Sequence, residues 1–382
     1  MMRRYTMFVR CPSGLLLLLA PVMLSLAVML TSCKAEETAA GGERMKHSRL
    51  LTLSSADGYH IAEIRNPWDS TKILQRLILA EAKTETPLPE GTVVKIPLSR
   101  SLVMSSVHCS LLEELGCAES VRAVCDAEYI NSEAIRQRIA EKRTVDCGSS
   151  MAPSVEHIAS ATPDAILISP YENIDNGKIE RLGCPLIQCA DYMEPSPLGR
   201  AEWIRFYGLL FGKQEEADSI FKTTEKRYLA IKALTDTLSV RPVVMSDLRY
   251  GQVWYVPSDS STVGQLYHDA GARNAFAGVA DTKGSIALSP EQVLKIAHDA
   301  DIWLIKTDKE TSMKTLTESD NIYKQFLPYR KRNIFVCNTM TSRFYEREPF
   351  HPELLLLDFV RIFHPELNIE GDNSFYYRIN EK

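Results

Sequence analysis

The chain has 382 residues, of which 45% are hydrophobic and 24% charged, and its formal net charge is −5. This composition is typical of a soluble globular protein, and a chain of this length usually folds as two domains rather than one. Because a negative chain lacks the basic stripe that binds phosphates, nucleic acid is not an expected partner.

The first 32 residues predict a signal peptide. Three arginines precede an apolar stretch, residues 15–30, which is shorter than the ~20 residues that a spanning helix needs. Small residues then lead into Cys33 and resemble the bacterial lipobox, in which the cysteine thiol takes a diacylglycerol and becomes the new N-terminus. The other interpretation is an ordinary secretory signal with a chance cysteine. We expect Cys33 to anchor the mature chain to a membrane through lipid only, in the periplasm.

Residues 33–49 are polar and small and predict a flexible tether. Two acidic residues, Glu36 and Glu37, follow Cys33 closely, and some bacteria with two membranes use such residues to send lipoproteins to the outer surface, so surface exposure is a second possibility. Residues 50–98 then contain four apolar runs separated by turn residues, which predict a strand-rich segment that packs on the next domain.

From residue 99 onward, short apolar runs alternate with helical patterns, which predicts βα units and a parallel sheet. The alternation covers residues 99–196 and 239–382. Between them, residues 197–238 carry apolar side chains every three or four positions and predict one long helix, which would bend or split at Gly208 or Gly212. The sequence therefore predicts an α/β fold of two Rossmann-like lobes joined by a long rigid helix, with an extra N-terminal strand-rich segment.

Nine cysteines are present, and removing the one in the signal peptide and Cys33 leaves seven. An exported chain can form disulfides, and nearness in the sequence leaves Cys109 with Cys117, or Cys184 with Cys189, as candidate pairs. No C-x-x-C spacing favours a zinc ribbon or a thioredoxin-like site. We expect most of the seven to be small buried apolar side chains.

Two matching stretches carry a family resemblance. The first lobe has PSVEHIA (153–159) before TPDAILI (162–168), and the second has LSPEQVL (288–294) before DADIWLI (299–305). With the two-lobe layout, they resemble the class III substrate-binding proteins of ABC importers, the group that serves siderophores, haem and cobalamin. The likeness covers roughly residues 101–367.

Each stretch places one glutamate, Glu156 or Glu291, early in a short helix. The helix macrodipole by itself favours a carboxylate there, so a helix-end role is one interpretation. The resemblance implies the other, in which one outward carboxylate on each lobe pairs with arginines of a permease. The implied partners are an ABC permease and its ATPase subunits, and the protein itself is expected to be a monomer.

In a two-lobed α/β protein the ligand binds between the lobes, at the carboxyl ends of the strands. The loops predicted there are rich in aromatic and cationic side chains, which suit a planar macrocycle or a catecholate ring with anionic groups. The alternative is that many of these aromatics fill the interface between sheet and helices. The predicted ligand-binding residues are Ser106, His108, Tyr129, Ser150, Tyr171, Arg249, Tyr250, Trp254, Tyr255, Lys306, Arg343 and Tyr345.

The predicted function is capture of an iron complex, a ferric siderophore or haem, for delivery to the permease; a cobalamin-binding protein of the same fold is the alternative. No resident cofactor and no metal site are expected. A bare metal ion would need three or four converging His, Asp or Glu side chains, and of eight histidines only His108 lies at a predicted strand end of the first lobe.

A lipoprotein hydrolase is the alternative from another class, although the expected answer is that the chain is not an enzyme. The chain has no G-x-S-x-G, H-E-x-x-H or P-loop motif. Ser105 or Ser106 with His108 is the only nearby pair of nucleophile and base, and residues so close along a strand end rarely reach triad geometry.

Overall fold

The computed structural model describes residues 45–81, 86–172, 176–280 and 282–381, which belong to one compact unit of the chain, residues 41–382. The predicted signal peptide, residues 1–32, and the predicted lipidation site, Cys33, lie outside the described residues. Within the described part of the chain, no helix combines the length and the apolar character needed to cross a membrane.

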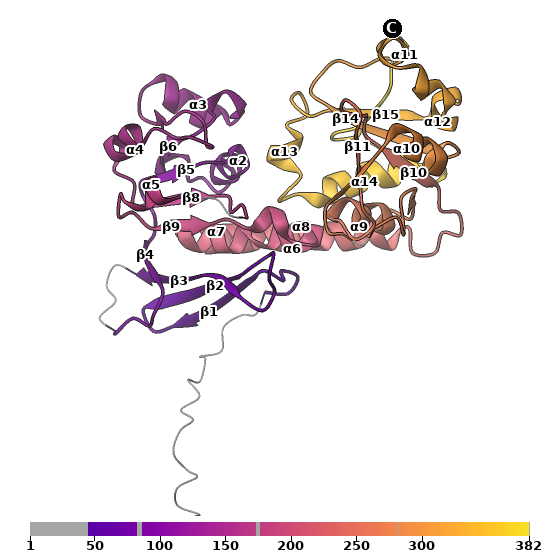
Figure 1. The fold of residues 1–382 in the computed structure, drawn as a ribbon. Coiled ribbons are helices and arrows are strands. Elements are labelled where there is room, and N and C mark those ends of the chain that lie inside the picture. The colour runs from indigo at the N-terminus through magenta and orange to yellow at the C-terminus, as the bar shows by residue number, and fades with distance from the viewer. Residues whose placement is uncertain (1–44, 82–85, 173–175, 281, 382) are drawn as a thin grey trace, which may run out of the picture. The chain divides into compact units, whose positions relative to one another are not determined.

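The strand-rich segment forms a four-stranded sheet in the order β1-β2-β3-β4 (Figure 1). Its strands are β1 (Leu51–Ala56), β2 (Tyr59–Arg65), β3 (Ile73–Glu81) and β4 (Thr92–Ile96). Neighbouring strands are antiparallel except β3 and β4, which run parallel. Leu77 and Leu79, two positions apart on β3, lie on one face and are buried together with Phe206 of the segment that connects the lobes.

Gln75 of β3 joins this sheet to the first lobe. Its Nε2 donates to Leu186 O (2.6 Å), and its Oε1 accepts from Gln188 N (2.9 Å). Both partners belong to β9 (Leu186–Gln188), the edge strand of the lobe's sheet. Because an edge strand presents unpaired backbone groups, the Gln75 amide occupies the place of a further strand.

The first lobe contains a five-stranded parallel sheet in the order β7-β6-β5-β8-β9. Its central strands β5 and β8 are buried at almost every residue, as expected for a parallel sheet covered by helices on both faces. The elements are β5 (Ser101–Val103), α2 (Ser106–Glu114), η1 (Ala118–Ser120), β6 (Val121–Val124), η2 (Ala127–Tyr129), α3 (Glu133–Ala140), β7 (Val145–Asp146), α4 (Val155–Ala161), β8 (Ala165–Ile168), α5 (Gly177–Glu180), β9 and η3 (Asp191–Met193).

The connection between the lobes is three helices, α6 (Pro197–Glu202), α7 (Ile204–Leu210) and α8 (Gln214–Ala233), so the helix predicted over residues 197–238 is split at Trp203 and, as expected, at Gly212. Gly212 causes the main break because its φ of +69° is a conformation that other residues rarely adopt. Gly208 instead permits close packing, since a Cβ there would lie 2.4 Å from the Ala217 Cβ. Helix α8 packs against α7 and against α14 (Pro352–Phe363) of the second lobe.

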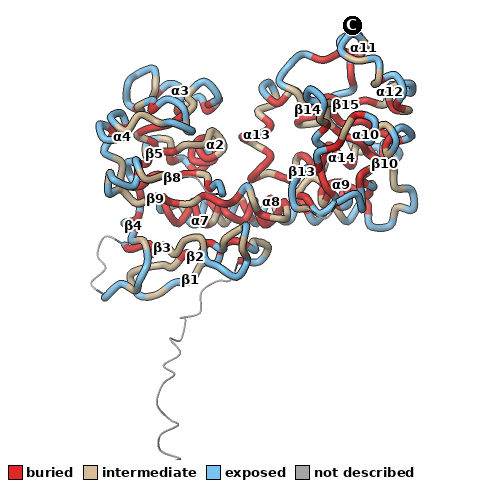
Figure 2. The backbone as a smooth tube through the Cα atoms, in the orientation of Figure 1, coloured by how far each residue is buried: buried red, intermediate tan, exposed pale blue. Residues whose placement is uncertain are grey.

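The second lobe contains a five-stranded sheet in the order β12-β10-β14-β15-β16, parallel except for β16, and a separate antiparallel pair, β11 and β13. The elements are β10 (Val243–Ser246), β11 (Trp254–Pro257), α9 (Thr262–Asp269), β12 (Arg273–Asn274), β13 (Ser285–Leu288), α10 (Pro290–Ala297), β14 (Ile302–Thr307), α11 (Met313–Ser319), η4 (Asn321–Gln325), α12 (Leu327–Arg330), β15 (Ile334–Asn338), α13 (Phe344–Arg347), α14 (Pro352–Phe363), η5 (Pro365–Leu367) and β16 (Tyr377–Arg378). In both lobes the central strands of the sheet are mostly buried, whereas the outer helix faces and loops are exposed (Figure 2). The predicted two-lobed α/β fold is confirmed.

All seven remaining cysteines are free thiols, and six of them are buried, so both candidate disulfides are wrong. Cys184 packs against the cluster that contains Leu102 and Ile166, whereas Cys189 lies in the cluster that contains Val103 and Leu167. Since residues 102 and 103 point to opposite faces of β5, the two thiols lie on opposite sides of the sheet and cannot pair. The Cys117 thiol instead donates to the carbonyl oxygen of Leu115 (3.6 Å).

The end of the predicted tether is held in place by a buried carboxylate. Backbone N–H groups of Lys46, His47 and Ser48 donate to Glu202, which is fully buried at the end of α6, over 2.7–2.8 Å. The prediction of a flexible tether is therefore wrong for residues 46–48, because partners about 155 residues away order them.

Candidate ligand-binding site

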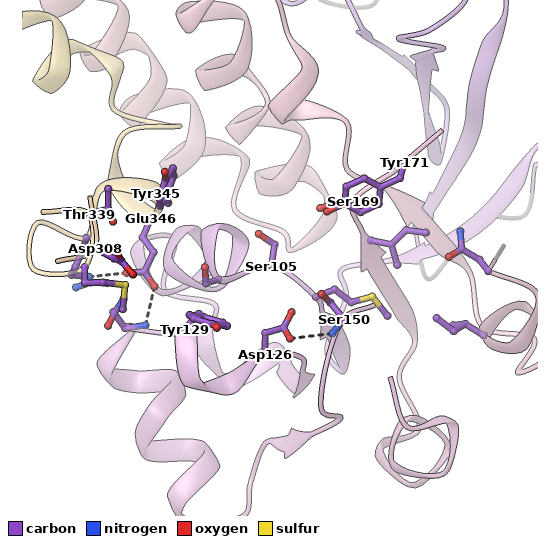
Figure 3. Close-up of a pocket in the computed structure, with 18 residues that line it drawn as sticks. Ser105, Asp126, Tyr129, Ser150, Ser169, Tyr171, Asp308, Thr339, Tyr345 and Glu346 are labelled. Atoms are coloured by element: carbon purple, nitrogen blue, oxygen red, sulfur yellow. Dashed lines mark hydrogen bonds and ion pairs between the residues drawn. The ribbon is translucent and has the colours of Figure 1, made fainter. Parts of the chain in front are cut away.

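A cavity of about 510 Å³ lies between the two lobes (Figure 3). Its walls include residues one or two positions after the ends of five parallel strands, which are β5, β6 and β8 of the first lobe and β14 and β15 of the second. These wall residues are Ser105, Asp126, Ser169, Asp308 and Thr339. The carboxyl ends of strands are where open α/β sheets bind ligands, and the volume lies within the range of small-molecule sites.

Six of the twelve predicted ligand-binding residues line this cavity. They are Ser106, Tyr129, Ser150, Tyr171, Arg343 and Tyr345. The three tyrosines stay exposed, at 58%, 51% and 57% for Tyr129, Tyr171 and Tyr345, so their rings are available to a ligand. They come from both lobes: Tyr129 and Tyr171 follow strands of the first, and Tyr345 lies on α13 of the second.

His108 does not line the cavity, and its prediction as a ligand-binding residue is corrected. Its side chain is buried inside the first lobe, with Nε2 2.9 Å from Asp191 Oδ1 and 2.9 Å from Tyr207 Oη. On helix α2, residue 108 lies about 200° around the axis from Ser106, which does face the cavity. The same burial removes the base on which the hydrolase alternative depended.

Trp254 is also corrected, because it is a core residue of the second lobe. Its side chain is fully buried against Trp303, Tyr323 and Phe326, and its Nε1 donates to Ser246 O (3.1 Å). The alternative that some predicted aromatics fill the interior holds for this residue.

The other four predicted residues lie outside the cavity lining. Arg249 forms an ion pair with Asp320, and Lys306 Nζ lies 4.0 Å from Asp247 Oδ2. The negative charge of Asp247 raises the pKa of Lys306, so this ammonium stays charged and paired. Tyr250 and Tyr255 are exposed, but neither is a lining residue. Arg249 and Lys306, two of the three cations predicted to meet an anionic ligand, are thus paired with carboxylates of their own lobe.

The predicted ligand-binding residues do not include the acidic members of the lining, which are Asp126, Asp308 and Glu346. A signal was present for two of them, since each follows an apolar run that predicts a strand: Asp126 directly, and Asp308 after Lys306 and Thr307. Asp126 has a left-handed backbone (φ 49°), and its Oδ1 accepts from Ser150 N (3.2 Å), which fixes the carboxylate at the cavity wall. Glu346 lies on α13, a four-residue helix that apolar periodicity cannot identify.

Polar contacts join the two lobes beside the cavity. Glu346 Oε1 accepts from Asn131 N (2.8 Å), and its Oε2 accepts from Arg343 Nε (3.0 Å). Nearby, His351 Nε2 lies 2.9 Å from both carboxylate oxygens of Glu114. Burial alone would lower the pKa of His351, but its hydrogen bonds to carboxylates outweigh burial and raise it to about 9. The imidazolium is therefore charged near neutral pH and forms an ion pair between the lobes.

The two predicted docking glutamates occupy equivalent positions. Glu156 lies in the first turn of α4 and Glu291 in the first turn of α10, and both are exposed. The helix caps are other residues, because the Ser154 and Ser289 side chains accept the backbone N–H bonds at these helix starts. Hydrogen bonding to Ser289 lowers the pKa of Glu291, which keeps it ionised.

Across the described ranges, no three His, Cys, Asp or Glu side chains converge as metal ligands would.

Known proteins similar in sequence to this chain belong to one family of two-lobed binding proteins or are relatives of unknown function. Residues 105–338 match the profile of a family described as periplasmic binding protein. Two uncharacterized lipoproteins of Methanocaldococcus jannaschii are 26% identical over 299 residues and 22% identical over 320 residues. The first match covers 75% of this chain and 70% of the relative, and the second covers 80% of each.

Solved structures share the fold at low identity. The periplasmic haem-binding protein RhuT from Roseiflexus sp. RS-1 has a TM-score of 0.53 at 21% identity, covering 70% of this chain and 99% of that one. The TroA-like periplasmic binding protein FepB from Veillonella parvula has a TM-score of 0.57 at 16% identity, covering 75% and 96%. Staphylococcus aureus IsdE, solved with haem, has a TM-score of 0.55 at 16% identity, covering 69% and 98%.

Proposed function

The chain belongs to the periplasmic binding protein family and has its two-lobed class III fold, and from this premise we propose that it is the lipid-anchored substrate-binding component of an ABC importer. The proposed ligand is an organic iron complex, with a corrinoid as the second candidate. The observation that carries this proposal is the cavity of about 510 Å³ between the lobes, lined by three exposed tyrosines at the carboxyl ends of the strands. A flat or bulky chelate gains from such aromatic walls, whereas a bare ion needs converging ligands.

Calorimetric titration tests the proposal. We expect saturable one-to-one binding of at least one probe among haem, ferric hydroxamate and catecholate siderophores, and cyanocobalamin. Tyr345→Ala should weaken that binding roughly tenfold, because it removes an aromatic contact, whereas Tyr250→Ala, an exposed tyrosine outside the cavity, should not. Saturable binding of zinc or manganese with no response to any complex would contradict the proposal. Calorimetry is preferred to tryptophan fluorescence, since no tryptophan lines the cavity.

The lipid anchor is the second part of the proposal and rests on Cys33 after small residues. Cys33→Ala is expected to abolish partitioning of the protein into a detergent phase, because no thiol is left to take the diacylglycerol, and to leave an uncleaved precursor or a released chain. Cys11→Ala, in the predicted signal peptide, is the matched control and should still give a lipidated product. A cleaved Cys33→Ala protein that still enters the detergent phase would refute the anchor.

Docking to a permease is the third part, and Glu156 and Glu291 are its proposed contacts. The helix positions, exposure and separate serine caps described above support it. Carboxylates on exposed first turns can accept bidentate pairs from arginine, one on each lobe. The partner would then engage both lobes at once.

A further inference from the structure

The cavity lining carries an excess of negative charge. Its charged members among the described residues are Asp126, Asp308, Glu346 and Arg343, three carboxylates and one guanidinium, with a formal net charge of −2. This is the opposite of the cationic cleft that the sequence predicts, because Arg249 and Lys306 lie outside the lining.

The single cation of the lining is already neutralised. Arg343 Nε donates to Glu346 Oε2 (3.0 Å), and its Nη2 lies 3.9 Å from Glu113 Oε2 and 3.4 Å from Ser110 Oγ. A guanidinium between two carboxylates has little charge left for an anionic ligand, and an anion would also have to approach both carboxylates. Arg343 therefore serves to hold α13 against the first lobe.

Asp126 and Asp308, in contrast, have no cationic partner among the residues that the structure describes. Asp126 is held by Ser150 N (3.2 Å), and Asp308 is exposed just beyond β14. The two carboxylates belong to different lobes and both line the cavity (Figure 3). A ligand between the lobes therefore meets one unpaired negative charge on each side.

One feature opposes the negative electrostatic potential that these carboxylates create in the cavity. Helix α2 begins at the cavity, where Ser105 and Ser106 are lining residues, and a helix N-terminus carries roughly half a positive charge. That partial charge is smaller than the two unpaired carboxylates, so the net field remains negative. The exposed rings of Tyr129, Tyr171 and Tyr345 add to the preference for positive charge, because aromatic faces attract cations.

We propose that the site selects uncharged or cationic chelates, such as ferric tris-hydroxamates with a free amine or corrinoids with intact side-chain amides, against anionic ones. Haem, with two propionates, and ferric tris-catecholates, with a charge of −3, are the disfavoured class. This inference rests on the proposed function and narrows its ligand.

A series of one chelate in three charge states tests the inference. The probes are a linear ferric tris-hydroxamate with a free terminal amine (+1), its N-acetylated form (0) and its N-succinylated form (−1), together with cyanocobalamin and its derivative in which one amide is hydrolysed to a carboxylate. For the series that binds, we expect affinity to fall roughly tenfold from the most positive to the most negative member, and the difference to shrink as salt is raised.

Asn variants identify the charges that cause the preference. Asp126→Asn with Asp308→Asn should remove most of the difference between the +1 and −1 chelates, while Asn keeps the size of each side chain and the acceptor for Ser150 N. Asp236→Asn is the matched control, an exposed carboxylate outside the cavity lining, and should leave the preference unchanged.

The outcomes separate this inference from the function on which it rests. Tightest binding of haem, a catecholate or the succinylated chelate would overturn the charge inference and leave the proposed function standing. A preference that survives in the double Asn variant would overturn the assignment to Asp126 and Asp308. Failure of every chelate and corrinoid to bind would overturn the proposed function, and the inference with it.

Discussion

Reversing the charge of both Glu156 and Glu291 is expected to abolish import while ligand binding stays intact. Both carboxylates are exposed on first turns of α4 and α10, one on each lobe, and neither lines the cavity. If each pairs with an arginine of a permease, a lysine in its place creates like-charge contacts that cost several kcal/mol across an interface. We expect uptake and ligand-stimulated ATPase activity to fall at least ~100-fold.

The measurement is transport in reconstituted vesicles beside calorimetry of the isolated protein. The dissociation constant for ligand should stay within about twofold of wild type, and the double variant should transport less than either single one because each glutamate serves a different lobe. Glu180→Lys with Glu318→Lys is the matched control, since it changes the net charge equally at exposed glutamates of α5 and α11. Wild-type transport by Glu156→Lys with Glu291→Lys would leave these residues as stabilisers of their helix ends only.

Removing the Glu202 carboxylate is expected to lower the free energy of unfolding substantially and to release the segment of residues 46–48. Glu202 is fully buried and accepts the backbone N–H groups of Lys46, His47 and Ser48. Each buried donor left without an acceptor costs about 1–3 kcal/mol, and Glu202→Ala removes the acceptor of three donors. Because the released segment can form hydrogen bonds with water instead, we expect the free energy of unfolding to fall by only about 3 kcal/mol in total.

Chemical denaturation measures the loss, and hydrogen exchange of residues 46–50 reports the release. Glu202→Gln keeps an acceptor oxygen but no charge, so its loss of stability should be roughly half that of Glu202→Ala, because hydrogen bonds to charged groups are about twice as strong as those to neutral groups. Glu215→Ala, at an exposed position in the first turn of α8, is the control and should stay within about 0.5 kcal/mol of wild type. Unchanged exchange protection of residues 46–50 in Glu202→Ala would show that other contacts hold the segment.

The sequence by itself determined the helices and strands that depend only on patterns among neighbouring residues. Alternating apolar residues predict strands β1 to β4, and buried apolar runs between helical patterns predict the sheets of both lobes, because side-chain period and burial are set over a few neighbouring residues. The ends of those strands locate the ligand site, since parallel strands bring their carboxyl ends to one edge. Ser154 and Ser289 could likewise be recognised as helix caps from adjacent residues.

Only the tertiary structure decided which side chains face the cavity and what charge it carries. His108 and Ser106 are two residues apart, yet the helix turns one into the core and the other toward the ligand site. Two of the three cations predicted for the site are neutralised by partners far along the chain, Arg249 by Asp320 and Lys306 by Asp247. Such pairings depend on distances in space that the spacing of residues along the chain does not give. The cleft predicted to be cationic is therefore acidic in the folded protein.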